Sequence, residues 1–384
     1  MDAVVVGAGF AGSVVARQLA NSGKKILVLE KRGQIGGNMF DSADSNGVMV
    51  HWYGPHIFHT NNRNVFDYLR QFADWHPYEH RVKGRIQGKL IPIPFNFTAI
   101  EAIFPKQQAE TLKEGLIHLF PKKERVSVLD LTGHIDPQIA ALGEFVFENV
   151  FVHYTAKQWG MPVEKVDTSV INRVPVVIGY DDRYFKDTIQ MMPDRGFSHL
   201  FEKLLDHHNI TVCVDTPASC RLTLGENKRF VLDGQAFTGP VVYTGPIDEL
   251  FDYRYGKLPY RSLDLRFEQL SQKEYQPAAV VNYPNEEKFT RITEFKKLTG
   301  QTLEGATTIL REYPMPFTHK PEEEAYYPIE NPENRSQYEA YATDAVGVPG
   351  LYLCGRLAEY KYYNMDGVVE RALLLANQIA EGKP

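Results

Sequence analysis

The sequence predicts an α/β fold whose first domain binds a nucleotide, and three observations carry this prediction. An apolar strand over residues 3–6 runs directly into the glycine-rich turn Gly7-Ala8-Gly9-Phe10-Ala11-Gly12. The turn opens a helical pattern, as expected where G-x-G-x-x-G joins a strand to a helix. A second apolar strand over residues 25–30 ends in Glu30, 18 residues after Gly12.

Each part of this stretch has a physical role. Gly7 permits the tight turn, Gly9 lets phosphates approach the backbone, and Gly12 lets the helix pack against the strand. The free N–H groups and positive end of the helix then favour a pyrophosphate. A lone G-x-G-x-x-G would be weak evidence, but the full order of elements predicts a dinucleotide site, with contacts from Gly7, Gly9, Phe10, Gly12, Glu30 and Lys31.

Two further stretches decide which dinucleotide is expected. Gly36-Gly37 would let the chain pass close to the middle of a long cofactor, although a plain turn is the alternative on these residues alone. Near the end of the chain, an apolar strand, a loop and a helix starting near Asp366 are typical of a segment that reaches a flavin ring. The sequence therefore predicts FAD, with further contacts from Gly37, Asn38, His56, Ile57, His59, Arg356, Met365 and Asp366.

Composition limits the class of protein and the kinds of ligand that are expected. A chain of 384 residues with 43% hydrophobic and 23% charged residues is typical of an enzyme of two or three domains. Its formal charge of −6 argues against general nucleic-acid binding, so a local basic cluster must hold any anionic ligand. No apolar run approaches the roughly 18 residues of a membrane span, and no signal peptide precedes the first strand, so the cytoplasm is expected.

Metal chemistry is not expected. The three cysteines, Cys213, Cys220 and Cys354, lack zinc-ligand spacing, and we expect them to be small core residues. His56 and His59 stand three residues apart in GPHIFHT, but no third ligand accompanies them, so a loop beside the flavin is the favoured interpretation. The acidic run 322–324 is most simply a solvated loop.

The remaining patterns divide the chain into three parts. A hairpin is predicted over residues 80–93, amphipathic helices over 107–119 and 137–152, and strands over 173–178, 253–266, 278–283, 290–295 and 307–313. We expect a discontinuous Rossmann-like FAD-binding domain from residues 1–75, 191–250 and 336–384. A helical insertion over 97–160 would carry a mobile substrate loop and an oligomer contact. A mixed or antiparallel β-sheet domain would comprise residues 76–96, 161–190 and 251–335.

These motifs, in this order, resemble those of the prokaryotic UDP-galactopyranose mutases over nearly the whole chain. The matching segments are VVVGAGFAGSVVA, LEKRGQIGGN, YGPHIFHT, YTAKQWG, NRVPV, DDRYF, YTGPID, NYPN, TRITEF, EYP and GRLAEYKYYNMD. Other FAD domains, of the amine oxidase and glutathione reductase type, would be expected to share only the first and last segments. The joint order is therefore specific to the mutases.

The resemblance implies a set of substrate residues. Arg173 and Arg291 would hold the diphosphate, although surface arginines in strands are the alternative on sequence alone. Phenol hydroxyls would assist them, Phe151 and Thr155 would lie beside uracil, and Trp159 would sit on the mobile loop, with core packing as its alternative. The implied substrate-binding set is completed by His80, Tyr184, Asn282, Tyr313 and Tyr362. The implied catalytic set is His59, Arg173, Arg291, Tyr362 and Asn364.

The resemblance also implies the chemistry. N5 of reduced FAD would act as a nucleophile on the anomeric carbon of UDP-galactopyranose, and the sugar would reclose as a furanose with no net redox. NADPH as electron donor and a homodimer are further expectations from the family. Asn364 replaces an aspartate common in the family, and His153 and Val150 also depart from its pattern. These departures leave open another nucleotide sugar, such as UDP-N-acetylgalactosamine or a dTDP-6-deoxyhexose.

Two more distant alternatives also remain at this stage. A hydride-transferring FAD oxidoreductase would turn over electrons, and a non-catalytic flavin-binding protein would have no evident use for the two arginines.

Overall fold

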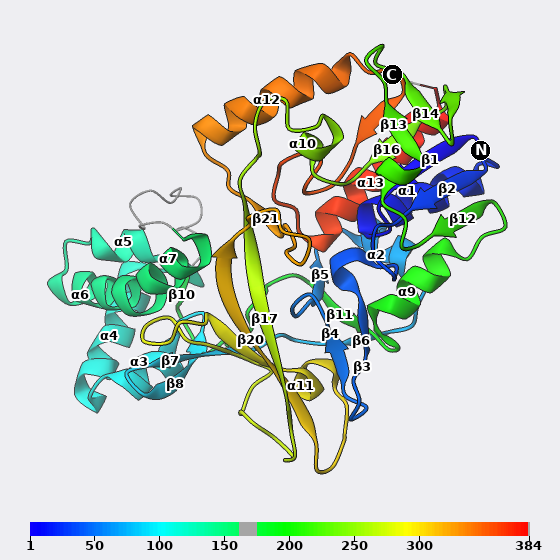
Figure 1. Cartoon of the computed structure of the whole chain (residues 1–384). Coiled ribbons are helices and arrows are strands. Elements are labelled where there is room, and N and C mark those ends of the chain that lie inside the picture. Colours follow the sequence, from blue (N-terminus) through cyan, green and yellow to red (C-terminus); the bar gives the residue numbers. More distant parts are fainter. Residues whose placement is uncertain (161–174, 383–384) are drawn as a thin grey trace.

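The computed structural model describes residues 1–160 and 175–382. A parallel sheet with its helices, a larger mixed sheet and a helical part extending to one side make up this region (Figure 1). The predicted α/β class is therefore confirmed. Among the described helices, none has both the length and the apolarity needed to cross a bilayer.

The nucleotide-binding unit is a five-stranded parallel sheet drawn from the beginning, middle and end of the chain. Its strands read AVVV and ILVL in the centre, as expected where both faces are covered. The strand order is β12 (Ile210–Cys213), β2 (Ile26–Leu29), β1 (Ala3–Val6), β16 (Val241–Tyr243) and β22 (Leu351–Leu353).

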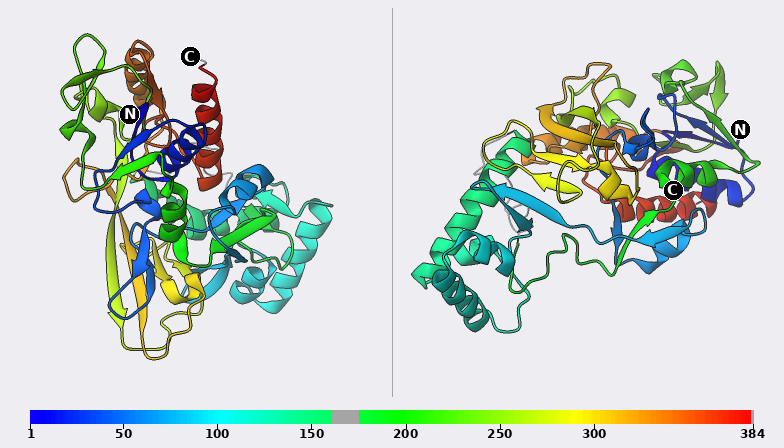
Figure 2. Two further views of the ribbon diagram at one scale, coloured as in Figure 1. Left: turned by 90° about the vertical axis from the view of Figure 1, so that its right-hand side faces the viewer. Right: turned by 90° about the horizontal axis from the view of Figure 1, so that it is seen from below.

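Three helices pack around this sheet. α1 (Phe10–Asn21) follows the glycine turn, and α13 (Met365–Ala380), from the end of the chain, lies beside it (Figure 2). α9 (Gly196–Leu205) packs on α1 as well, and its N-terminus is capped by Asp41, whose carboxylate accepts hydrogen bonds from the N–H groups of Phe197 and Ser198. Elements from near both ends of the described chain thus pack together in this unit.

The second sheet has seven strands and is mixed. Only β18 and β7 run parallel, and every other neighbouring pair is antiparallel. The predicted hairpin is confirmed as β7 and β8, with Gly88 in its turn. The strand order is β21 (Tyr327–Pro328), β17 (Tyr260–Leu270), β20 (Thr307–Pro316), β19 (Arg291–Glu294), β18 (Val280–Asn282), β7 (Val82–Ile86) and β8 (Lys89–Ile93).

The helical part packs with β7 and β8 around a hydrophobic core that includes Leu116, Leu142 and Val146. The helix predicted over 137–152 divides into an α-helical segment and a π-helical turn from Phe147 to Val152. Its helices are α3 (Phe97–Ile103), α4 (Lys106–Leu119), α5 (Val128–Thr132), α6 (Pro137–Val146) and α7 (His153–Trp159).

Some predicted strands need correction. The strand expected over 173–178 is described as β10 (Pro175–Val177), and it pairs with β9 (Arg125–Ser127) of the helical part instead of the large sheet. Val176 explains this placement, because its side chain is buried in the core of the helical part. The strand expected from residue 253 begins only at Tyr260, because Asp252 and Tyr253 adopt positive φ in a turn.

Several smaller elements complete the described chain, and among them α12 and two three-stranded sheets were not indicated by the sequence patterns. Cys220 is exposed and Cys213 half-buried, so of the three cysteines only Cys354 is a buried core residue. The further elements are β3 (Asp41–Ala43), β4 (Met49–His51), β5 (Phe58–Thr60), α2 (Arg63–Leu69), β6 (Trp75–Pro77), β11 (Ile189–Pro193), β13 (Leu222–Leu224), β14 (Phe230–Leu232), β15 (Gln235–Phe237), α10 (Ile247–Leu250), α11 (Phe295–Thr299) and α12 (Pro332–Val346).

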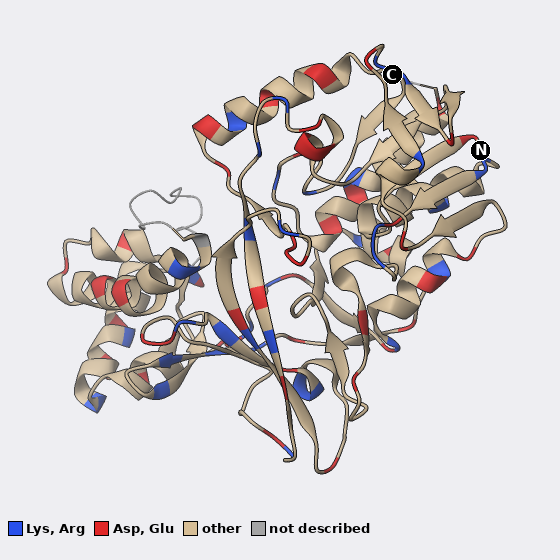
Figure 3. Cartoon of the chain, viewed as in Figure 1, with Lys and Arg blue, Asp and Glu red and all other residues tan. Residues whose placement is uncertain are grey.

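Charged side chains of both signs are interspersed over all three parts of the molecule (Figure 3). Many form local pairs, such as Arg81 with Asp182 and Arg183 with Asp181. The acidic run also makes such contacts. Its last member, Glu324, pairs with Arg32, so this carboxylate is not simply solvated as the sequence pattern indicated.

Candidate cofactor and substrate site

A cavity of about 670 Å³ opens between the parallel sheet and the seven-stranded sheet. It borders the carboxyl ends of β1, β2 and β16, where open α/β sheets bind their ligands. Its wall continues to Arg291 on β19 and to the segment preceding α13. One continuous space therefore joins the glycine-rich turn to the half-buried guanidinium of Arg291.

The glycine-rich turn forms a close-fitting wall of this cavity. Gly7 has φ +100°, and a Cβ on Gly12 would lie 1.9 Å from the Gly7 carbonyl oxygen. A Cβ on Gly37 would lie 3.0 Å from the Cα of Gly9, and Gly36 donates its N–H to the Ala8 carbonyl at 2.9 Å. The two glycine segments thus lie against each other, at a spacing that side chains would prevent.

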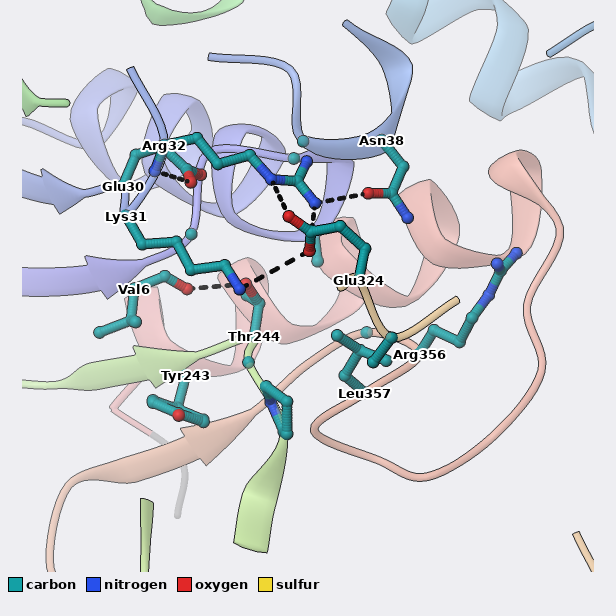
Figure 4. Close-up of a pocket in the computed structure, with 18 of the residues that line it drawn as sticks. Val6, Glu30, Lys31, Arg32, Asn38, Tyr243, Thr244, Glu324, Arg356 and Leu357 are labelled. Carbon is teal, nitrogen blue, oxygen red and sulfur yellow. Dashed lines mark hydrogen bonds and ion pairs between the residues drawn. The ribbon is translucent and has the colours of Figure 1, made fainter. Parts of the chain in front are cut away.

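Glu30 ends β2 and is 5% exposed. Its Oε2 accepts from the Ala8 N–H at 2.8 Å, and its Oε1 accepts from the Arg32 N–H at 2.9 Å. The carboxylate therefore fixes the turn to the end of β2 while it lines the cavity (Figure 4).

This geometry fits a dinucleotide. The N-terminus of α1 has no side-chain cap, so its first N–H groups are available to an anion beside Gly9. The side-chain-free cradle leaves room for phosphates, and Glu30 occupies the position that favours a ribose. Of the predicted cofactor residues, the cavity is lined by Gly7, Gly9, Phe10, Glu30, Lys31, Gly37, Asn38, His56, Arg356 and Met365.

The segment before α13 closes another side of the cavity. Arg356 donates to the carbonyls of Tyr326 at 3.1 Å and Tyr363 at 2.6 Å. Asn364 lines the cavity at the N-cap of α13, without a side-chain capping bond. Asp366 is placed just outside, where it accepts a hydrogen bond from Thr60 Oγ1 at 2.7 Å and so ties α13 to β5.

The three histidines singled out from the sequence differ in their surroundings. The pKa of His56 lies well below its usual value, mainly because the imidazole is buried. Electrostatic interactions with His51, Arg356 and Arg291 lower it further. Burial, then the charges of Arg291 and His59, lowers the pKa of His80 to about 3. Both imidazoles are therefore neutral at physiological pH.

His59 does not line the cavity, and neither does Ile57. Its Nδ1 lies 2.9 Å from Asp187 Oδ2, and its ring stacks on Phe185 at 3.6 Å between centroids. Phe185 also stacks on His80 at 5.8 Å. The structure thus brings His59 next to His80, held by a carboxylate that the sequence did not single out.

Arg291 carries the positive charge at the far end of the cavity. Its Nε donates to Glu312 Oε1 at 2.6 Å, across the β19–β20 pair, and Glu312 is 1% exposed. Burial opposes the charge of Arg291, but the Glu312 carboxylate outweighs it and raises the pKa of the guanidinium. Within the described part of the chain, the two Nη groups make no protein hydrogen bond, so they can donate to a ligand.

The phenols of Tyr184 and Tyr327 interact electrostatically with Arg291, and aromatic rings also pack against Arg356. Tyr327 stacks on Tyr362 with centroids 6.0 Å apart, and the Arg356 guanidinium lies 5.0 Å and 4.9 Å from their rings. Tyr184, 41% exposed, contacts the edge of His80. Tyr327 was missed by the sequence analysis, although it stands in the tyrosine pair next to Pro328.

Tyr313 is not brought to this group. It follows Glu312 on β20, and successive residues of a strand point to opposite faces. Its ring instead packs against the Arg266 guanidinium at 4.2 Å and against Phe289 at 5.8 Å. The structure therefore does not bring the predicted phosphate contact Tyr313 to the cavity, whereas Tyr327 lies on the cavity wall.

The predicted uracil residues lie in the helical part. Phe151 is 2% exposed and stacks on Phe147, and Thr155 is 4% exposed. Both are covered by protein in this structure. Tyr154 lies between these two residues in the sequence, and its phenol interacts electrostatically with Arg291.

Asn282 ends β18 directly opposite Arg291 in the strand register. Arg173 and the side chain of Trp159 lie outside the described residues.

Comparisons with known proteins agree with this geometry. The family model described as UDP-galactopyranose mutase matches residues 149–362, and a model for a NAD(P)-binding Rossmann-like domain matches residues 5–72. The UDP-galactopyranose mutase of Mycoplasma pneumoniae is 35% identical over 99% of this chain and 96% of its own length. A dTDP-fucopyranose mutase of Escherichia coli is 31% identical, with 96% of each chain covered.

A solved structure shares the fold at lower sequence similarity. The crystal structure of a reduced UDP-galactopyranose mutase superimposes with a TM-score of 0.69 at 17% identity, covering 99% of this chain and 95% of that one. The Rossmann-like fold expected from the sequence is thereby confirmed, as is the resemblance stated from the motifs. The chain belongs to the UDP-galactopyranose mutase family.

Proposed function

We propose that this chain interconverts UDP-galactopyranose and UDP-galactofuranose, with reduced FAD as cofactor and no net redox. One observation carries the proposal: a single cavity joins a dinucleotide cradle to the paired guanidinium of Arg291. A flavin oxidoreductase needs the cradle and a substrate site, but it does not need a second site for a diphosphate. A half-buried cation beside the cradle, held by a buried carboxylate, suits a substrate that carries its own diphosphate.

The residues that would hold FAD come from both ends of the chain. The Gly7–Gly12 turn and α1 would take the pyrophosphate, Glu30 the ribose, and Arg356 with the start of α13 the flavin end. Reduced flavin, when bound, supplies N5 as a nucleophile toward the anomeric carbon.

The residues of the chain then bind, orient and shield the substrate. Arg291 would donate its Nη groups to the diphosphate and retain UDP while its bond to the sugar is broken. Tyr184, Tyr327 and Tyr362 would donate phenol hydroxyls and exclude water with their rings. Arg173 is proposed as the second diphosphate ligand, and Phe151, Thr155 and Trp159 as the uridine contacts, on the strength of the family motifs.

Neutral side chains would border the sugar. The lowered pKa of His80 keeps its imidazole uncharged, so it can accept or donate one hydrogen bond without binding a second cation next to Arg291. Asn364, on the cavity wall, can hydrogen-bond but cannot act as a base. Asn282 remains a proposed sugar or phosphate contact. His59, positioned by Asp187, is the proposed proton carrier at this side of the site.

Other parts of the proposal follow from family membership. We propose a homodimer and NADPH as electron donor, with the three-part domain division given by residues 1–75, 191–250 and 336–384, residues 97–160, and residues 76–96, 161–190 and 251–335. Location in the cytoplasm is proposed from the sequence alone.

A second function is favoured by one finding. The relative named dTDP-fucopyranose mutase is 31% identical over 96% of this chain. The diphosphate ligands would serve either nucleotide sugar, so selectivity must lie at the base and at the sugar. Isothermal titration with UDP and with dTDP separates the two, because the favoured nucleotide should bind at least tenfold more tightly.

The direct test of the proposed function is product analysis. Purified protein, reduced with dithionite, is incubated with UDP-galactofuranose, and the nucleotide sugars are separated by chromatography. We expect UDP-galactopyranose to form. If FAD is bound and UDP binds but no product appears, the sugar assignment is wrong and another UDP-sugar, such as UDP-N-acetylgalactosamine, is the next substrate to test.

A further inference from the structure

Glu324, the last residue of the acidic run, reaches into the cofactor cavity. Its carboxylate accepts from Arg32 Nε at 3.0 Å and lies 2.7 Å from Arg32 Nη2, which is a two-point contact. Lys31 Nζ lies 3.6 Å away. Figure 4 shows these three side chains meeting at the cavity wall, with Glu324 arriving from a different segment than the two cations.

Arg32 is held in one orientation by its other neighbours. Its Nη2 donates to Asn38 Oδ1 at 2.9 Å, and its guanidinium lies 4.0 Å from the ring centroid of Tyr53. Only 13% of its side chain is exposed, against 23% for Glu324. A guanidinium fixed on this many sides loses little further freedom when a ligand arrives.

The contact joins distant parts of the chain. Arg32 follows β2 of the parallel sheet, whereas Glu324 precedes β21 of the seven-stranded sheet. The neighbouring residues Ala325 and Tyr326 also line the cavity. A dinucleotide in the cavity would therefore be bordered on one side by the glycine cradle and on another by this segment.

We propose that Glu324 is a positioning residue of the dinucleotide site. It holds Arg32 along the cavity wall and keeps the segment before β21 closed against the end of β2, so that release of bound cofactor requires the pair to separate. Glu324 also offsets the charge of two adjacent cations beside the positive end of α1. This inference rests on the proposed dinucleotide and does not depend on which sugar is isomerised.

A purely structural ion pair would behave differently. It would contribute equally with and without cofactor, so its loss would lower the melting temperature of the apoprotein and leave the rate of cofactor release unchanged. A positioning role predicts the opposite, because separation of the pair is then part of the release step.

The experiment compares FAD release from Glu324→Gln and Glu322→Gln proteins. Glu322 lies in the same loop, is exposed and undergoes the same change of charge, so it is the matched control. Holoprotein is diluted, and the rise in flavin fluorescence gives the release rate. The melting temperature of each apoprotein is measured in parallel.

We expect roughly tenfold faster release from Glu324→Gln, release within twofold of wild type from Glu322→Gln, and apoprotein melting temperatures within about 2 °C of wild type for both. Release within twofold of wild type for Glu324→Gln would overturn the inference, as would a loss of apoprotein stability that accounts for the whole effect. Failure of the wild-type protein to bind FAD would instead contradict the proposed function.

Discussion

At the scale of single residues, the site depends on charges that are paired before any ligand arrives. Glu312 gives Arg291 a buried partner and leaves its Nη groups available, so the guanidinium stays charged inside the protein. A lone buried cation would cost far more free energy than a paired one. The pairing therefore prepares a diphosphate site at the end of the cavity.

Replacement of Arg291 by alanine should weaken UDP binding about 100-fold, because a charge-assisted contact worth on the order of 2–3 kcal/mol is lost. Arg266→Ala is the matched control. Arg266 lies on the same sheet, but it pairs with the exposed Asp264 and packs on Tyr313. Calorimetric titration with UDP measures both variants, and equal affinities for them would contradict the assigned role of Arg291.

The lowered pKa of His80 predicts how the free energy of unfolding depends on pH. Its pKa is about 3 in the folded protein, below the ordinary value near 6.5, chiefly because it is buried. As pH falls from about 6.5 toward 3, the unfolded chain binds a proton that the folded chain does not, so stability is lost in this range. Between pH 7 and pH 5 the loss should be about 2 kcal/mol.

The comparison with His80→Gln isolates this contribution. Urea unfolding at pH 7 and pH 5 should show that the wild-type protein loses about 2 kcal/mol more than the variant. An identical loss in both proteins would mean that His80 is protonated in the folded state.

The sequence predicted which residues belong to the site better than it predicted what those residues contact. Arg291 was singled out from its motif, and the structure places it on the cavity. Tyr313 was not distinguishable from Tyr327, because the sequence does not tell which face of β20 is turned to the cavity. Asp187 and Glu324 were not predicted, for a related reason. Each is more than a hundred residues away in sequence from its partner, His59 or Arg32.

At the scale of elements, the second and third glycines of the turn, Gly9 and Gly12, have separable roles. A Cβ on Gly12 would overlap the Gly7 carbonyl, whereas the nearest atom to a Cβ on Gly9 is 3.7 Å away. Gly9 also has φ −82°, which alanine accepts. Gly12 is therefore required by the fold, and Gly9 by the ligand.

Alanine substitutions separate these roles. Gly9→Ala should leave the melting temperature of the apoprotein within about 2 °C of wild type and weaken FAD binding at least tenfold, because the new methyl group enters the cavity. Gly12→Ala should lower the melting temperature by roughly 5 °C or more, since helix and strand must move apart. Differential scanning calorimetry and flavin titration test the pair, and normal FAD binding by Gly9→Ala would contradict the cofactor placement.

Elements set by local sequence were predicted well. The strand–turn–helix–strand start of the chain and the hairpin around Gly88 both depend on patterns within a short stretch of sequence. The partner of β10 depends on which core buries Val176, and that is a property of the folded chain. The helix α12 was missed because its polar residues give it little apolar periodicity, although Asn331 caps it and Pro332 follows at its first position.

At the scale of the whole molecule, the fold brings three distant stretches to one cavity. The parallel sheet supplies the cradle, the segment before α13 closes one side, and the seven-stranded sheet supplies Arg291. The contact of Arg32 with Glu324 joins the two sheets beside that cavity. This arrangement accounts for a family that needs a dinucleotide and a nucleotide sugar in adjacent positions.

The central claim is that the flavin serves the isomerisation without net electron transfer. Anaerobic turnover of UDP-galactofuranose, followed by chromatography and by the flavin absorbance together, tests it most directly. We expect many molecules of UDP-galactopyranose for each reduced flavin, absorbance that stays that of the reduced flavin, and no product with oxidised protein. Oxidation of one flavin for each molecule of substrate consumed would show an oxidoreductase and contradict the account.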